Sequence, residues 1–342
     1  MWRIVPFGSV FLYLLGGPAV AAEPAWELIQ PTESRSNLVL RSTRGSALVE
    51  RQGGGAQRVP LRSDELLTAI AETRIGWTAA GIREREQGTE VIIFNRGSQG
   101  IKRLLSPTPQ RHSLRLKPSL VVENEELEGL AWLEGTDLSS LSVRVASWTS
   151  EGWDDVSIVA PPARGSQTGL VNAALADGSW LLVWSAFDGQ DDEILWSLGR
   201  HDRWSDPEQL GKNNTVPDIT PALIATADGA LLAWSRMIDG QYQLLLSRFN
   251  GDGWSRPERV GPPGSLQPEF AVQNRQLFLL YRHAWPRGWA VVDLSPDGLT
   301  QRVAVFADSG GSRPVLMDSY GEGVELRWPD KGRQRARWEV LP

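Results

Sequence analysis

Short apolar runs separated by turn residues make up most of this chain. The clearest example lies between residues 220 and 262, where Asp228-Gly229 and Asp239-Gly240 divide the apolar segments. An Asp-Gly step between alternating apolar runs is the strongest short-range sign of a β-hairpin. We therefore predict a unit of four antiparallel strands, a to d, at Pro221–Ala225, Leu231–Ser235, Tyr242–Ser247 and Trp254–Val260.

Large aromatic residues repeat this unit along the chain. One series falls on strand b at steps of 55, 52, 50, 47 and 47 residues: Trp77, Trp132, Trp184, Trp234, Tyr281 and Trp328. A second series falls at the start of strand d, at steps of 51 and 50 residues: Trp153, Trp204 and Trp254. Repeats of this length with four short strands are propeller blades. The predicted fold is all-β, a β-propeller of four-stranded antiparallel blades, with the once-per-blade tryptophans packed between sheets.

The two ends of the chain decide the number of blades. The repeats lie near residues 36–62, 63–106, 116–162, 168–211, 219–263, 267–307 and 313–342. We read Asn37–Gln52 as strands a and b of a truncated first blade, with strand d at Gln57–Leu61. The last repeat, Pro314–Leu341, supplies strands a, b and c, and Trp26–Ile29 is expected to add its strand d and close the ring. Seven blades are favoured, with six blades plus an N-terminal hairpin as the alternative.

The first residues read as an export signal. Met1-Trp2-Arg3 is followed by an apolar run to about Val20, broken by glycine and proline, and Ala19-Val20-Ala21 provides a small-residue cleavage site. A transmembrane anchor is the alternative, and the glycine–proline break disfavours it. We expect a signal peptide over residues 1–21, a single propeller domain over 22–342, no membrane span after cleavage, and a periplasmic or secreted location.

Composition narrows the function classes. The chain has 34 Gly, 22 Pro and 16 Trp, which suits strands and turns, and it has no Cys, which excludes disulfides and thiolate chemistry. The net charge is −6, and the one local basic stretch places Lys331, Arg333, Arg335 and Arg337 at every second position. That spacing is typical of one solvated face of a strand. A nucleic-acid partner is therefore not expected, because it requires a basic surface that neutralises phosphates.

The link between strands c and d resembles a known family motif. Residues 247–254 read SRFNGDGW, and Ser247, Gly251 and Trp254 match the Ser-x-Asp-x-Gly-x-Thr-Trp hairpin, the Asp-box of the sialidase superfamily. Phe249 and Gly253 occupy its aspartate and threonine positions. Earlier repeats keep fewer matching positions: Ser197, Trp204 and Trp153. The resemblance implies a propeller and raises a sialidase-like glycoside hydrolase as an alternative function. Propeller lectins, which bind sugars between blades, are a weaker resemblance.

The b-to-c and d-to-a connections share one end of the blades, and we call this the loop face. Successive b-to-c loops on it carry the candidate ligand-binding residues, which combine cations with an out-of-register tryptophan: Arg236, Arg282, His283, Trp285 and Arg287. The alternative is that these side chains solvate long loops, with each arginine paired to a nearby aspartate such as Asp239.

A third loop, Phe187–Glu193, is acidic. Asp188, Asp191 and Asp192 would suit a hard cation or a general acid, and an ordinary solvated turn would have the same composition. The histidines lack metal-ligand spacing, so we assign no metal, no cofactor and no catalytic residue.

From these observations we expect an exported, non-enzymatic propeller that binds a protein or glycan partner through its loop face. The alternatives are a sialidase-like glycoside hydrolase and a structural subunit of an envelope complex.

Overall fold

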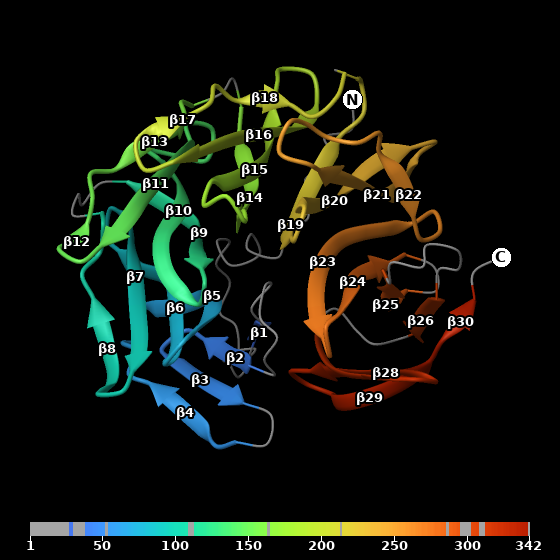
Figure 1. Ribbon diagram of the computed structural model, residues 1–342, viewed down its shortest axis with the longest axis horizontal. Coiled ribbons are helices and arrows are strands. Elements are labelled where there is room, and N and C mark those ends of the chain that lie inside the picture. The colour runs from blue at the N-terminus through green and yellow to red at the C-terminus, as the bar shows by residue number, and fades with distance from the viewer. Residues whose placement is uncertain are drawn as a thin grey trace, which may run out of the picture.

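The computed structural model shows a ring of seven antiparallel β-sheets around a central axis (Figure 1). It describes residues 27–29, 38–51, 54–108, 113–162, 165–212, 214–284, 287–294, 302–307 and 312–340. All regular elements in these ranges are strands. Within the same ranges no helix could cross a membrane. The prediction of an all-β propeller with seven blades is confirmed, and the six-blade alternative is set aside.

The blades follow one another in sequence. Blade 1 contains β1 (Glu27–Ile29), β2 (Leu38–Thr43), β3 (Ser46–Arg51) and β4 (Ala56–Val59). Blade 2 contains β5 (Glu65–Thr73), β6 (Gly76–Arg85), β7 (Gly88–Gly97) and β8 (Gly100–Leu104). Blade 3 contains β9 (Leu114–Glu123), β10 (Glu126–Gly135), β11 (Ser142–Thr149), β12 (Gly152–Trp153) and β13 (Ser157–Ala160).

Blade 4 contains β14 (Gln167–Ala174), β15 (Trp180–Phe187), β16 (Asp192–Arg200), β17 (Arg203–Trp204) and β18 (Glu208–Gln209). Blade 5 contains β19 (Asp218–Thr226), β20 (Gly229–Ile238), β21 (Gln241–Phe249) and β22 (Glu258–Val260). Blade 6 contains β23 (Ser265–Gln273), β24 (Gln276–His283), β25 (Gly288–Asp293) and β26 (Arg302–Ala307), with β30 (Glu339–Val340) added at its outer edge. Blade 7 contains β27 (Val315–Tyr320), β28 (Gly323–Trp328) and β29 (Gly332–Arg337).

The predicted hairpin turns have the backbone geometry that their residues favour. Between β20 and β21, Asp239 and Gly240 have φ of 50° and 78°, and Ile238 pairs with Gln241 across the two-residue loop. Positive φ at both positions is the mark of a type I′ turn, whose twist matches that of the flanking strands. The fourth strand of this blade starts later than predicted, because Trp254 makes only an isolated bridge to Phe249 before β22 begins.

Seven apolar clusters fill the seven junctions between neighbouring blades, as far as the structure describes them. The strand-b aromatics form much of this core, with exposed fractions between 0% and 3%: Trp77, Trp132, Trp184, Trp234, Tyr281 and Trp328. Their predicted packing role is confirmed. Trp77 departs from the register, since it is the second residue of β6 whereas Trp234 is the sixth of β20.

Ring closure differs from the sequence-based expectation. β1 pairs antiparallel with β2 as the innermost strand of blade 1, so residues 38–51 form the second and third strands of that blade. The ring closes through side chains: Leu28 and Val39 of blade 1 pack against Val315 and Met317 of blade 7. The chain end crosses instead to blade 6, where β30 pairs with β26. Trp26 and the expected signal peptide lie outside the described residues.

Candidate functional site

A buried polar residue is the first or second residue of the innermost strand in five successive blades, at the loop face. These residues recur at steps of 50, 52, 51 and 47, and none is more than 1% exposed: Glu65, Arg115, Gln167, Asp218 and Ser265. Each one pairs in register with a residue near the end of the second strand: Arg83, Glu134, Ala186, Arg236 and His283. Three of the five cross-strand pairs are ion pairs, in blades 2, 3 and 5.

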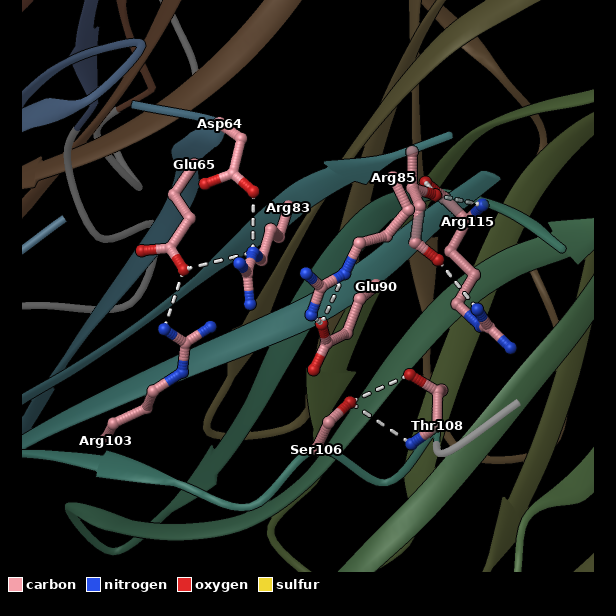
Figure 2. A network of polar contacts seen from close by, with 10 residues as sticks. Asp64, Glu65, Arg83, Arg85, Glu90, Arg103, Ser106, Thr108 and Arg115 are labelled. Atoms are coloured by element: carbon pink, nitrogen blue, oxygen red, sulfur yellow. Dashed lines mark hydrogen bonds and ion pairs between the residues drawn. The ribbon is translucent and has the colours of Figure 1, made fainter. Parts of the chain in front are cut away.

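In blade 2, the buried Glu65 carboxylate lies between two arginines (Figure 2). Arg103 Nη1 donates to Glu65 Oε1 at 2.6 Å, and Arg83 Nε lies 3.8 Å from the same oxygen. Arg83 also donates to Asp64 Oδ2 at 2.7 Å. Opposite charges on neighbouring strands hold the inner part of the blade together at this end.

Blades 5 and 3 use the same device, and in blade 3 the charges of the two strands are exchanged. In blade 5, Arg236 donates from Nε and Nη2 to the two oxygens of Asp218, at 2.6 and 2.5 Å, and Trp234 Nε1 donates to Asp218 at 2.9 Å. In blade 3 the acid is on the second strand, where Glu134 accepts from Arg115 at 3.1 Å and from the Trp132 indole at 2.8 Å. The pair therefore satisfies the buried indole N–H whichever strand carries the acid.

The junction between blades 4 and 5 adds further carboxyl groups to this device. Glu193 is 1% exposed and accepts hydrogen bonds from the Asn214 backbone N–H at 3.0 Å and from Asn214 Nδ2 at 3.1 Å. The same side-chain amide donates to Asp218 Oδ2 at 3.2 Å, so one amide bridges the two acids. Burial raises the pKa of Glu193 to about 7, with a smaller contribution from the charges of Asp218 and Asp191.

Asp191 lies on the b-to-c turn of blade 4, next to this pair. It is 6% exposed, and both of its carboxylate oxygens are buried without a hydrogen-bond donor. Burial raises its pKa, and the charge of Asp188 adds to the effect. Asp188 itself is exposed and accepts hydrogen bonds from the backbone N–H groups of Gln190 and Asp191. We call Asp188, Asp191 and Asp192 the acidic turn.

The arginine that acts on Asp191 is already bound elsewhere. Arg236 acts electrostatically on Asp191, and it is held by Asp218 through two hydrogen bonds. Tyr242 of β21 is half-buried, and burial together with the charge of Asp192 raises its pKa. Within the described ranges, no group of three acidic or histidine side chains has the arrangement that would hold a metal ion.

The predicted ligand-binding arginines do not converge. On β20, the even-numbered residues Leu232 and Trp234 face blade 4, so Arg236 also faces blade 4. On β24, the even-numbered residues Phe278 and Leu280 face blade 7, so Arg282 points the other way. For Arg236 the structure agrees better with the alternative that the arginine is paired to a nearby aspartate, and the partner is Asp218 rather than Asp239.

The remaining predicted residues have varied surroundings. His283 is buried beside Tyr281, with ring centroids 6.3 Å apart, and Arg287 is exposed at the entry to β25. Trp285 lies outside the described residues.

The Asp-box-like link forms a structural turn. Ser247 Oγ donates to the carbonyl of Ser255 at 2.7 Å, and the Arg248 backbone N–H donates to Ser255 Oγ at 3.0 Å. The preceding blade repeats the first contact, from Ser197 to Ser205 at 2.9 Å. Ser247, which matches the Asp-box serine, thus stabilises the c-to-d turn. This turn lies on the face of the propeller opposite to the loop face that carries the acidic turn.

Comparisons with known proteins identify the fold class. No protein-family model and no curated protein matches the chain. Among solved structures, the WD40 domain of SCAP from fission yeast is 13% identical, with a TM-score of 0.57 and coverage of 93% of this chain and 87% of that one. The polysaccharide lyase Uly1 is 8% identical, with a TM-score of 0.57 and coverage of 98% and 94%.

The β-propeller domain of the Trilobed protease from Pyrococcus furiosus, described as having an open velcro topology, is 11% identical. Its TM-score is 0.50, and the match covers 93% of this chain and 98% of that one. At these identities the likeness establishes a β-propeller. Propellers of this shape include the WD40 domain of SCAP and a polysaccharide lyase, and fold alone does not select between roles.

Proposed function

We propose that this chain is an exported, non-enzymatic propeller that binds a protein partner on its loop face, between blades 4 and 5. The acidic turn would receive a lysine or arginine side chain of the partner. The observation that carries the proposal is Asp191, whose buried carboxylate has no donor although it lies beside Asp188 and Asp192. A buried charge without a partner is costly, and an incoming cation would remove that cost.

The surroundings of the acidic turn suit a cationic side chain. Asp188 is exposed and Asp192 half-buried, so the approach from solvent is lined by carboxylates. A hydrogen-bonded ion pair between a carboxylate and a lysine or arginine side chain is roughly twice as strong as a hydrogen bond between neutral groups.

Two observations weigh against the alternative of a sialidase-like hydrolase. Glu193 has the pKa of a general acid, but it is 1% exposed and its carboxylate is already held by the backbone and side-chain amides of Asn214. Arg236 and Arg282 face opposite neighbours instead of meeting around a carboxylate. Glycan binding is also less supported, because every tryptophan within the described ranges is buried or half-buried rather than presented as a platform.

Capture from the envelope fraction tests the proposal. Asp188→Asn with Asp192→Asn removes two charges from the acidic turn and keeps the side-chain shapes. Asp206→Asn with Glu208→Gln is the matched control, since it removes two exposed charges from the same blade. We expect a protein retained by the wild type and the control to be lost by the acidic-turn variant, and its retention to weaken with added salt.

A second variant and a glycan array separate the remaining hypotheses. Arg282→Ala with Arg287→Ala tests the b-to-c loop of blade 6. If this variant alone loses the captured protein, the site lies on blade 6. Binding to a defined sugar on the array, unchanged by the acidic-turn variant, would replace the protein-partner proposal with a glycan-binding one.

A further inference from the structure

The outermost strand of blade 7 has an open edge. β29 pairs with β28 on one side, and no described strand pairs with its other side (Figure 1). In every other blade a fourth strand covers the equivalent position. After Arg337 the chain crosses to blade 6 and pairs as β30 with β26. The free edge presents backbone N–H and C=O groups to any extended segment that reaches it.

The side chains of β29 give this edge a strong positive character. Arg333, Arg335 and Arg337 are exposed on one face of the strand, and Gln334 and Ala336 alternate with them on the other. The exposed fractions of the Arg333 and Arg335 side chains are 54% and 73%, although both contact Glu325.

The arginine face of β29 looks toward blade 1. Arg333 pairs in register with Arg327 of β28, so their side chains share one face of the sheet. Arg327 donates a hydrogen bond to Glu50 of blade 1, so this face is the one toward blade 1. On blade 1, Glu50 lies between Arg327 and Arg41, so its charge is already neutralised. Arg58 on the outer strand β4 is exposed and faces the same way, because it pairs with Leu48 on the side of β3 opposite to the core residues Ala47 and Val49.

The outer half of the junction between blades 7 and 1 therefore carries an excess of positive charge. Six arginines lie along it: Arg41, Arg58, Arg327, Arg333, Arg335 and Arg337. Three described acids face them: Glu50 and Glu325, which are both in ion pairs, and Asp318, which lies opposite Glu325 and acts electrostatically on Arg335. The junction between blades 4 and 5 is instead filled at this depth by rings, where Trp196, Phe249 and Trp254 meet.

We propose that the open edge of β29 binds an extended segment of an acidic partner protein, which adds to blade 7 as its fourth strand. Cross-strand neighbours on one face of a sheet contact each other directly, and opposite charges there are favourable. The matching segment therefore has acidic side chains at every second position, so that they fall opposite the arginines while the backbone pairs with the edge.

The charges on the edge argue for this occupant over a second copy of the chain. Pairing of β29 with β29 would place arginines opposite arginines, and like charges directly opposite are destabilising. Charged side chains also protect edge strands from aggregation. If the arginines only prevented aggregation, the edge would not prefer any particular sequence in a partner. If they bind a partner, a segment with matching acidic residues should bind more tightly than one without them.

A pair of peptides with equal composition makes this test. One alternates glutamate with threonine or valine, and the other has the same residues with the glutamates in one block. Binding to the full chain is measured by fluorescence anisotropy. Hydrogen exchange of the backbone amides of residues 332–337 is measured with and without peptide. We expect the alternating peptide to bind about tenfold more tightly and to slow exchange of the outward-facing amides.

Charge reversal at the edge supplies the matched variants. Arg337→Glu changes a side chain that lies opposite Gly323 in the register, so no cross-strand contact is lost. It should weaken the alternating peptide by about tenfold. Arg203→Glu, an exposed arginine on the outer strand β17 of blade 4, is the control and should leave binding unchanged.

Four results would overturn the proposal. The first two are equal affinity for the two peptides, and peptide binding that does not slow hydrogen exchange of the β29 amides. The third is slow exchange of those amides already in the free protein, which would mean that the chain's own residues cover the edge. The fourth is a concentration-dependent dimer that Arg337→Glu abolishes. The acidic-turn variant, on the opposite side of the ring, should bind the peptide normally, so this proposal and the proposed function fail separately.

Discussion

Arg327 of β28 donates a hydrogen bond from Nη1 to Glu50 Oε2 of β3, at 2.5 Å and across 277 positions of sequence. This ion pair lies next to the small apolar cluster that joins blade 7 to blade 1. No described strand pairing joins these two blades. Side-chain contacts between residues from the two ends of the chain therefore close the ring.

The closing ion pair should be measurable by a double-mutant cycle. Arg327→Gln, Glu50→Gln and the double variant should give a coupling of about 1 kcal/mol in urea unfolding, since both side chains are about a fifth exposed. The coupling should shrink with added salt. A coupling indistinguishable from zero would assign closure to the apolar cluster alone.

The same pair should make closure sensitive to acid. Burial alone would raise the pKa of Glu50, but the hydrogen bond and charge of Arg327, with Arg41, lower it below its ordinary value of 4.5. A carboxyl group whose pKa is lowered on folding stabilises the fold above its unfolded pKa, and this contribution is lost as pH falls through the folded pKa. Unfolding below pH 4.5 should therefore depend less on pH in Glu50→Gln than in the wild type.

The strand-b tryptophans should be among the most costly residues to truncate. Trp184 and Trp234 are both 0% exposed, and each fills a junction between blades. Replacing either with alanine should lower the free energy of unfolding by about 3–5 kcal/mol. Trp204, half-buried at the c-to-d turn, is the comparison and should cost less. Similar costs at Trp204 and Trp234 would contradict the assigned packing.

The exchanged charges of blades 3 and 5 predict a rescue. Asp218→Asn leaves Arg236 without its carboxylate and should cost about 3–5 kcal/mol, because a buried ion pair loses one member. The double change Asp218→Arg with Arg236→Glu copies the arrangement of Arg115 and Glu134. It should recover a large part of the loss in thermal and urea unfolding. Failure to recover any stability would mean that the two blades are not equivalent at this position.

Glu193 should make stability fall as pH rises toward neutrality. Its pKa is about 7 in the folded protein against an ordinary value of 4.5. A carboxyl group with a raised pKa stabilises the fold below its unfolded pKa, and that contribution is lost as pH rises through the folded value. Glu193→Gln should remove the pH dependence between 4.5 and about 7, and should stabilise the protein at pH 8 by up to roughly 3 kcal/mol. An unchanged pH profile would show that Glu193 is not the titrating group.

The blade period was predictable because the tryptophans that mark it are large and recur once per blade. The opposite directions of Arg236 and Arg282 were also readable from the sequence. Arg236 lies two residues after Trp234 and Arg282 lies one residue after Tyr281, so strand alternation places them on opposite faces. The two arginines therefore occupy equivalent loops but differ in parity. The buried polar residues at steps near fifty, such as Asp218, are a second repeat signal in the sequence.

Other features could not be predicted from the sequence. β1 has a single buried apolar residue, Leu28, and a three-residue strand of this kind suits the inner edge of one blade as well as the outer edge of another. The environment of Glu193 depends on Asn214, which reaches it from a connection 21 positions away. No local pattern relates the two residues.

The position of β30 has a mechanical consequence. Blade 7 is joined to blade 6 by two covalent crossings, one from β26 to β27 and one from β29 to β30, whereas it meets blade 1 through side chains. A force that pulls the two chain ends apart would therefore load a boundary without strand hydrogen bonds. The ring should part first between blades 7 and 1, at low force, and the last two blades should then unfold together as one unit rather than in succession.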